Sequence, residues 1–227
     1  MRVLIWVLVG LIGSFSTLAP AQEAKPVKAT GAVELKDAAG DMGPITTSDG
    51  EEPPLDVVLL AIKSDGKRIT FAATLKDNPG RFATAPVTAY IDADNNPATG
   101  VKLGFEGPTG FEYKAEISLC IKYDGGGEAC SGAAGKKPTE RYGAVNLDHF
   151  KGKSNYDEKE TVVDSMGFPG SKASVKVPVT GKVVEASFEY ADLKAKPGQT
   201  IRILAQETGG SAKDGDGYFP VVLLTLK

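Results

Sequence analysis

The strictest pattern in the sequence is an alternation of apolar and polar residues that runs from Phe111 to Asp124. Every second side chain, from Phe111 to Tyr123, is apolar or aromatic, and most of those between are charged or polar. Because successive side chains of a β-strand point to opposite faces, this stretch predicts a long strand with one buried and one wet face. Such strands are typical of antiparallel sheets.

Shorter runs of the same period predict further strands. They cover residues 56–62, 69–75, 86–91, 175–179, 183–190, 200–206 and 221–226. Glycine and proline separate them, no segment has a sustained helical period, and one short helical turn is expected over 190–195. In a chain of about 200 mature residues, this pattern predicts one all-β domain built as an antiparallel β-sandwich.

The alternation is lost over residues 125–170, a polar and turn-rich segment that carries Tyr142 and Tyr156. It is long for a plain loop. We therefore expect either an elaboration that binds a ligand or a partly disordered insertion, and the pattern does not choose between them.

The first 21 residues predict an export signal. Arg2 is followed by an apolar run over 3–12 and by small residues at 19–21, which are typical of a cleavage site. A membrane anchor is the alternative, but the apolar run is only half of the roughly 20 residues that span a bilayer. We expect a secreted or periplasmic protein with a flexible leader over 22–31 and a folded domain over 32–227.

Removal of the signal leaves all 29 acidic residues and one fewer than the 26 basic ones. A mildly acidic chain is a poor partner for nucleic acid, which requires clustered basic residues. Nothing after residue 22 is apolar enough for a membrane span. Trp6, the only tryptophan, lies in the predicted signal.

The two cysteines, Cys120 and Cys130, flank a glycine-rich turn centred on Gly125. In an exported protein this spacing predicts a disulfide across a hairpin. A redox motif would have two intervening residues, and a metal site would need more ligands.

No catalytic constellation stands out in the sequence, and we assign no catalytic residue. His149 is the only histidine, and the nucleophile-elbow, zinc-protease and phosphate-loop motifs are missing. A pair of carboxylates could still hydrolyse glycosides without histidine.

The stretch "YIDADNNPATG" over 90–100 follows a predicted strand and is rich in side-chain oxygens. Asp92, Asp94 and Asn96 alternate and could converge on calcium. Local chemistry favours the alternative, in which they bond their own backbone in Asx-turns. An EF-hand is excluded, because Pro97 and Leu103 stand where that loop needs glycine and glutamate. A second acidic turn, at 214–217, is ambiguous in the same way.

Five motifs follow one another along the chain: "DAAGD" at 37–41, "PLDVVLLAIKSDGKRITFAATL" at 54–75, "YIDADNNPATG", "GFEYKAEISL" at 110–119 and "GDGYFPVVLLTL" at 215–226. In this order they resemble the exported domains grouped with family-nine carbohydrate-binding modules and DOMON-like domains. The resemblance covers most of 32–226 apart from the polar segment.

The resemblance implies a jelly-roll-like sandwich that often carries structural calcium and often binds sugars. It makes Asp92, Asp94 and Asn96 metal candidates, with Asp41 and Asp56 as neighbours. Fold analogy alone does not transfer function. DOMON-like haem binders hold the haem iron by axial ligands. The candidates for such ligands in this sequence are His149 with Met42 or Met166, which is too weak a set to predict haem.

The mature chain departs from sugar-binding members of the family, which typically stack tryptophan on the sugar. Tyrosines are the substitutes in this sequence, and the candidates for ligand binding are Tyr123, Tyr142, Tyr156 and Tyr218. The leading expectation is a non-catalytic, exported binding or accessory domain with a calcium-stabilised turn, for which a carbohydrate is the candidate ligand. The alternatives are an envelope-associated domain that binds a protein and, third, an acid-pair glycoside hydrolase.

Overall fold

The computed structural model describes residues 25–47, 50–79, 82–103, 109–133, 137–151, 162–165, 175–179, 181–212 and 217–227. The predicted signal peptide over 1–21 and most of the leader lie outside these ranges. Within them, the structure has no helix that is long and apolar enough to cross a membrane.

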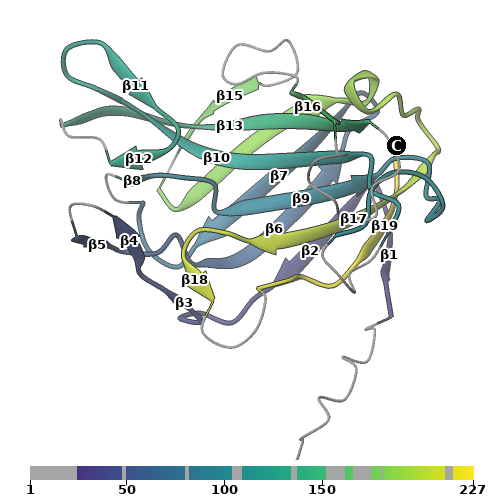
Figure 1. The fold of residues 1–227 in the computed structure, drawn as a ribbon, viewed down its shortest axis with the longest axis horizontal. Coiled ribbons are helices and arrows are strands. Elements are labelled where there is room, and N and C mark those ends of the chain that lie inside the picture. The colour runs from purple at the N-terminus through teal and green to yellow at the C-terminus, as the bar shows by residue number, and fades with distance from the viewer. Residues whose placement is uncertain are drawn as a thin grey trace, which may run out of the picture.

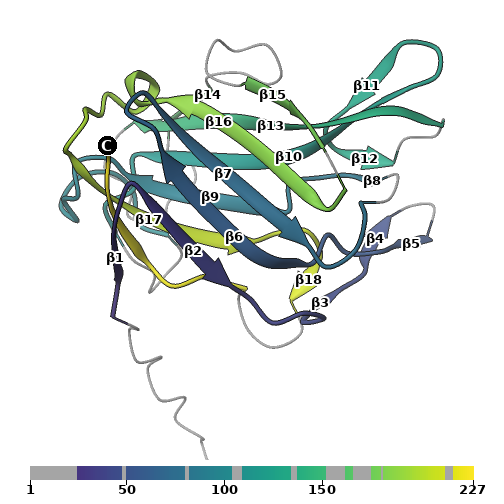
Figure 2. The ribbon, with the colours of Figure 1, turned by 180° about the vertical axis from the view of Figure 1, so that it is seen from behind.

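The molecule is an all-β sandwich of two layers (Figure 1). The front layer contains, in spatial order, β1 (Val27–Thr30), β19 (Val222–Thr225), β17 (Thr200–Glu207), β9 (Val87–Asp92), β10 (Tyr113–Tyr123) and β13 (Pro138–Lys151). The back layer, nearest the viewer in Figure 2, contains β16 (Val183–Glu189), β7 (Arg68–Leu75), β6 (Val57–Ser64) and β2 (Ala32–Lys36). Neighbouring strands in both layers are antiparallel, except that β1 runs parallel to β19.

The two layers are connected at both edges. At one edge, β15 (Val175–Pro178) pairs with β13 of the front layer and with β16 of the back layer. At the other edge, β1 and β2 are consecutive strands separated only by Gly31. Few strand edges are therefore left unpaired.

One apolar core fills the space between the layers. The inward side chains of β10, from Tyr113 to Ile121, are at most 3% exposed and pack against those of β7 and β16, such as Phe71 and Phe188. The rings of Phe71 and Phe188 stack with centroids 6.0 Å apart. Burial of this continuous apolar surface is the main force that holds the layers together.

The predicted strands are confirmed, with small shifts at their ends. The long alternating segment forms β10, and the shorter runs form β6, β7, β9, β15, β16, β17 and β19. The predicted helical turn is the 3-10 turn η1 (Tyr190–Leu193).

The structure adds ordered strands at two places where the sequence pattern predicts none. Residues 27–30, placed in the flexible leader, form β1, and Val27 and Ala29 pack against the core. Residues 138–151, placed in the loose segment, form β13, the longest strand of the described chain. The polar segment over 125–170 is thus in large part a member of the front sheet.

Several short strands lie at the ends and edges of the sandwich. They are β3 (Met42–Gly43) with β18 (Ser211–Ala212), β4 (Ile45–Thr47) with β5 (Gly50–Glu52), β8 (Phe82–Ala83) with β12 (Gly132–Ala133), β11 (Gly127–Ala129) on β10, and β14 (Val162–Ser165) on β13. The pair of β3 and β18 lies at the lower side of the sandwich in Figure 1, and β11 extends with the end of β10 past its upper left.

Candidate functional site

The outer face of the front sheet carries a row of polar side chains that crosses four strands. Gln206 of β17 pairs with Thr88 of β9, Thr88 pairs with Glu116 of β10, and Glu116 pairs with Asn146 of β13. Tyr218 continues the row, because its backbone bridges to Gln206. Directly paired residues of antiparallel strands share a face, so these five side chains line one side of the sheet.

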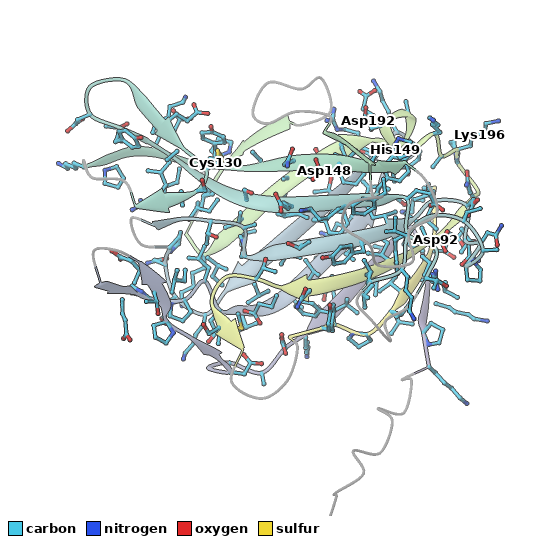
Figure 3. All side chains as sticks on the ribbon, in the orientation of Figure 1. Asp92, Cys130, Asp148, His149, Asp192 and Lys196 are labelled. Carbon is cyan, nitrogen blue, oxygen red and sulfur yellow. A yellow bond between two sulfur atoms is a disulfide. The ribbon has the colours of Figure 1, made fainter. Side chains whose placement is uncertain are left out.

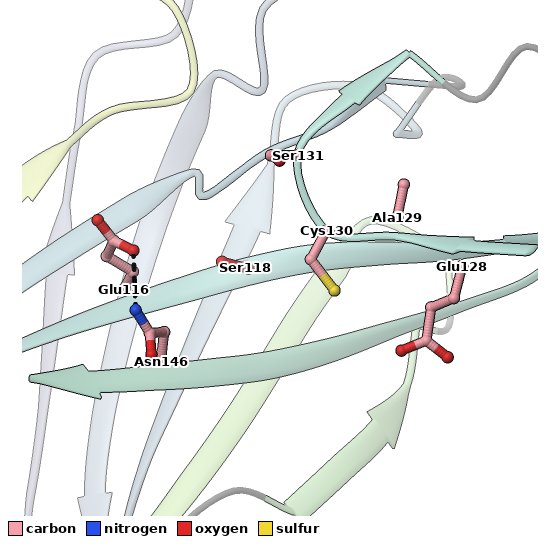
Figure 4. A pocket seen from close by; sticks show the side chains of 7 residues that line it. All are labelled: Glu116, Ser118, Glu128, Ala129, Cys130, Ser131 and Asn146. Carbon is pink, nitrogen blue, oxygen red and sulfur yellow. Dashed lines mark hydrogen bonds between the residues drawn. The ribbon is translucent and has the colours of Figure 1, made fainter. Parts of the chain in front are cut away.

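A hollow of about 550 Å³ lies at the β13 end of this row (Figure 4). Glu116, Ser118 and Asn146 form its floor, and residues 128–131 of the β11 segment form its wall. The amide nitrogen of Asn146 donates to Glu116 Oε2 at 3.4 Å. Within the described chain, the buried Oδ1 atom of Asn146 has no hydrogen-bond partner.

Glu116 of the floor belongs to a group of charges of both signs on β10 and β13. Lys114 Nζ lies 2.8 Å from Glu116 Oε1 and 3.7 Å from Asp148 Oδ2. Burial of Lys114 disfavours its charge, but the carboxylates of Glu116 and Asp148 outweigh burial and raise its pKa. The carboxylate of Glu116 in the floor is therefore paired with a cation that stands next to the hollow.

The predicted disulfide between Cys120 and Cys130 is present and fastens the wall of the hollow to β10. Beneath the wall, the hydroxyl of Tyr142 donates to Glu128. Burial and then Glu128 raise the pKa of Tyr142. The disulfide and this hydrogen bond hold the β11 segment over the outer face of the sheet.

The structure does not gather the four predicted tyrosines. Tyr142 is only 1% exposed, so its ring cannot stack on a ligand, and that prediction is wrong. Tyr123 is partly buried against the core. Tyr156 lies outside the described residues. Tyr218, at 44% exposure, is the one predicted tyrosine in the described ranges whose ring is open to a ligand.

The stretch "YIDADNNPATG" forms a tight turn closed by its own side chains. The backbone N–H of Asn96 donates to Asp92 Oδ1 at 3.0 Å and to Asp94 Oδ1 at 2.9 Å. Asn96 Oδ1 accepts from the N–H of Ala98 at 3.0 Å. Gly100 has φ +67°, and a Cβ there would strike the backbone of Phe111. The local chemistry is that of Asx-turns, one of the two expectations for this stretch.

A third carboxylate, Glu112, joins Asp92 and Asp94 at this turn, and oxygens of the three lie within 4.8 Å of one another. Thr99 Oγ1 lies 2.7 Å from Glu112 Oε1 and 3.0 Å from Asp94 Oδ1. Glu112 Oε2 accepts from the N–H of Ala93 at 2.8 Å. Donors of the protein therefore already satisfy the carboxylates that a cation would bind.

Arg202 supplies the positive charge of this turn. Its Nε and Nη2 atoms lie 3.0 and 2.8 Å from Asp92 Oδ2, and its guanidinium lies 4.8 Å from the centre of the Phe111 ring. Burial raises the pKa of Asp92 and of Glu112, although Arg202 pulls the pKa of Asp92 down. A calcium ion would have to compete with Arg202, so the turn fits calcium poorly. Calcium at Asp92, Asp94 and Asn96 remains a prediction.

A second acidic cluster lies at the other end of β17. Oxygens of Asp37, Asp41 and Glu207 lie within 4.8 Å of one another. Glu207 is 3% exposed, and its Oε1 accepts from the N–H of Val57 at 2.5 Å. Burial, followed by the charges of Asp37 and Asp41, raises the pKa of Glu207 to about 8 against the opposing effect of the Val57 hydrogen bond.

The predicted metal residues are thus divided between two places. Asp92 pairs with Arg202 at one end of β17, whereas Glu207, beside Asp41, ends the strand five residues later. That separation is about 17 Å along a strand. Asp56 accepts from the N–H of Gly40 at 2.6 Å, in the loop between Asp37 and Asp41. Asp41 and Asp56 are therefore not neighbours of Asp92, and their expected place beside it is wrong.

Figure 3 shows that Asp92 and Cys130 lie toward opposite ends of the front sheet. His149 is near the Asp92 end, and its ring stacks on Tyr113 with centroids 4.7 Å apart. The only histidine of the sequence therefore packs against an aromatic ring.

A scan against protein-family models finds no match to the sequence. A search of curated proteins finds none either. The resemblance to family-nine modules and DOMON-like domains therefore stays an expectation drawn from the ordered motifs.

Sequence reasoning missed several residues that the structure brings into these sites, namely Asp37, Glu112, Glu116, Asn146 and Glu207. A signal for Glu207 was present, because it follows Ile201, Ile203 and Ala205 at an inward position where an apolar residue is expected. No such signal exists for Glu116 or Asn146, which occupy ordinary wet positions of their strands.

Proposed function

We propose that this chain is an exported binding domain that holds a carbohydrate on the outer face of its front sheet. The proposal is carried by the Oδ1 atom of Asn146 in the floor of the hollow, which has no hydrogen-bond partner among the described residues. A buried acceptor is costly until a donor reaches it. A sugar hydroxyl can donate to Asn146 and, by rotation, to the neighbouring carboxylate of Glu116.

The polar row suits an extended ligand. From Asn146 to Tyr218 it crosses four strand spacings, or roughly 19 Å. The exposed ring of Tyr218 lies at the end away from the hollow and can pack on the apolar face of a sugar. The row therefore combines hydrogen-bonding groups with an aromatic side chain, as binding sites for small polar ligands do.

The charge on this face also favours a neutral ligand rich in hydroxyl groups. Lys114, beside Glu116 on the same face, is paired with Glu116 and Asp148, so these three groups carry no excess positive charge. A polyanion would meet two carboxylates, and its binding would require a clustered basic surface.

Titration calorimetry with a panel of soluble glycans tests the proposal. At least one glycan is expected to bind, and Asn146→Ala and Glu116→Gln should each weaken its binding about tenfold, the equivalent of one lost hydrogen bond. Glu34→Gln on β2 of the back sheet, an exposed carboxylate far from the hollow, should leave the affinity unchanged. Binding that neither floor variant weakens would place the site elsewhere.

No heat with any glycan would contradict a carbohydrate ligand. Recovery of one stoichiometric partner from envelope extract would then favour the protein-interaction alternative.

An acid-pair glycoside hydrolase is the second candidate, because Glu116 and Glu128 both line the hollow. The same glycans, assayed for newly released reducing ends, separate the two functions. Reducing ends that the wild type releases, and that neither Glu116→Gln nor Glu128→Gln releases, would identify a hydrolase. Binding without product would identify a binding domain.

A further inference from the structure

The cluster of Asp37, Asp41 and Glu207 lies where β17 ends, on the inner side of the front sheet, whereas the hollow lies on the outer face. Along β17, Ile203 and Ala205 face the core, so Glu207 points inward as well. Its carboxylate reaches β6 of the back layer, where it accepts from the N–H of Val57. The cluster therefore sits between the front and back layers.

The carboxylates of this cluster have fewer protein partners than those of the turn at Asp92. In the part of the chain that the structure describes, Glu207 Oε2 and Asp41 Oδ1 are buried and have no hydrogen-bond partner. Glu207 is 97% withdrawn from solvent, since only 3% of it is exposed. A buried carboxylate oxygen without a donor is costly, and native structures rarely leave one so.

In the part of the chain that the structure describes, the three carboxylates also lack a cationic partner. Lys76 Nζ lies 3.8 Å from Asp56 Oδ2, at the flank of the cluster. Among the described residues, no ion pair ends on Asp37, Asp41 or Glu207. This arrangement contrasts with Asp92, whose charge Arg202 already meets.

We propose that Asp37, Asp41 and Glu207 bind a divalent cation, and that the cation is calcium. Oxygen atoms within 4.8 Å of one another fit a single calcium shell, in which each ligand lies at about 2.3–2.6 Å from the ion. Carboxylates that come wholly from the protein suit calcium better than magnesium, which keeps several waters. The hard oxygen ligands disfavour softer metals.

A cation at this place would stabilise the sandwich rather than take part in ligand chemistry. Asp37 and Asp41 belong to the loop after β2, and Glu207 ends β17 of the front layer. The Asp56 carboxylate holds the same loop through the N–H of Gly40. One ion would therefore link the loop after a back-layer strand to the front layer.

Thermal unfolding of the purified protein, with calcium and with chelator, tests the proposal. Circular dichroism is the suitable readout, because the only tryptophan lies in the predicted signal. Calcium at a hundred times its dissociation constant should raise the Tm of the wild type by at least about 5 °C. Glu207→Gln and Asp41→Asn should lose most of this rise.

The chelated variants distinguish a cation site from a merely structural carboxylate. Without calcium, Glu207→Gln should melt no lower than the wild type, because it removes a buried like-charge neighbour and keeps an acceptor for Val57. Asp94→Asn, in the other acidic cluster, is the matched control and should keep the full calcium response. The proposal fails if the wild type shows no response, or if Asp94→Asn abolishes the response while Glu207→Gln retains it.

Discussion

At the scale of single residues, the turn after β9 depends on one ion pair. Asp92 is fully buried, and Arg202 satisfies it through two nitrogens while its guanidinium lies over Phe111. Nη2 of Arg202 also donates to the carbonyl of Thr109, so one side chain ties β17 to both flanks of the turn. The desolvation of two buried charges offsets much of their attraction, so the pair adds little net stability, although the loss of one partner is costly.

Arg202→Met is expected to destabilise the protein by about 3–5 kcal/mol, because it leaves the charge of Asp92 buried without a partner. Chemical denaturation followed by circular dichroism measures the loss. In the double variant with Asp92→Asn, more than half of the lost stability should return. Losses that simply add in the double variant would show that the two side chains do not act as a pair.

At the scale of elements, β13 is the strand that the alternation could not predict. Its inward positions include Gly143, and its outward positions include Tyr142 and Ala144, which are buried beneath the β11 segment. Apolar residues therefore stand on both faces, and the period of two disappears. Glycine is needed at position 143, because a Cβ there would collide with the carbonyl of Glu185 on β16.

Gly143→Ala should destabilise the protein by at least about 3 kcal/mol, because the added methyl group meets backbone and not a movable side chain. Gly132→Ala is the control: it stands at φ +85° with open space around its Cβ position, so only backbone strain of about 1–2 kcal/mol is expected. Urea denaturation compares them. Equal losses at the two positions would contradict a close approach of β13 and β16.

At the scale of the whole molecule, the buried Glu207 makes stability depend on pH. Its pKa in the folded protein is raised to about 8, above the ordinary value of 4.5. Between these two values the folded protein binds more protons than the unfolded chain, so the free energy of unfolding falls as pH rises. The stabilisation is complete below the unfolded pKa and is lost as pH passes through the folded pKa.

In chelator, the wild type is therefore expected to lose stability relative to Glu207→Gln as pH rises from about 5 to 8.5, by at most about 1.4 kcal/mol per pH unit. Denaturation of both proteins at a series of pH values measures this difference. Burial also raises the pKa of Asp92 and Glu112, but both proteins share those groups. Parallel pH profiles would contradict the raised pKa of Glu207.

The sequence by itself determined the fold class, most strands and the disulfide. Local periodicity suffices for a strand such as β10, in which one face is buried and the other is wet. The spacing of Cys120 and Cys130 about a glycine turn likewise needs only a hairpin.

Only the tertiary structure decided which polar residues meet. Glu116 and Asn146 are 30 positions apart, and Asp41 and Glu207 come from opposite ends of the domain. Strand order and register bring each pair together, and neither is visible in local patterns because both depend on how distant strands pair. The same pairing separated Asp41 and Asp56 from Asp92 and buried Tyr142 under the β11 segment.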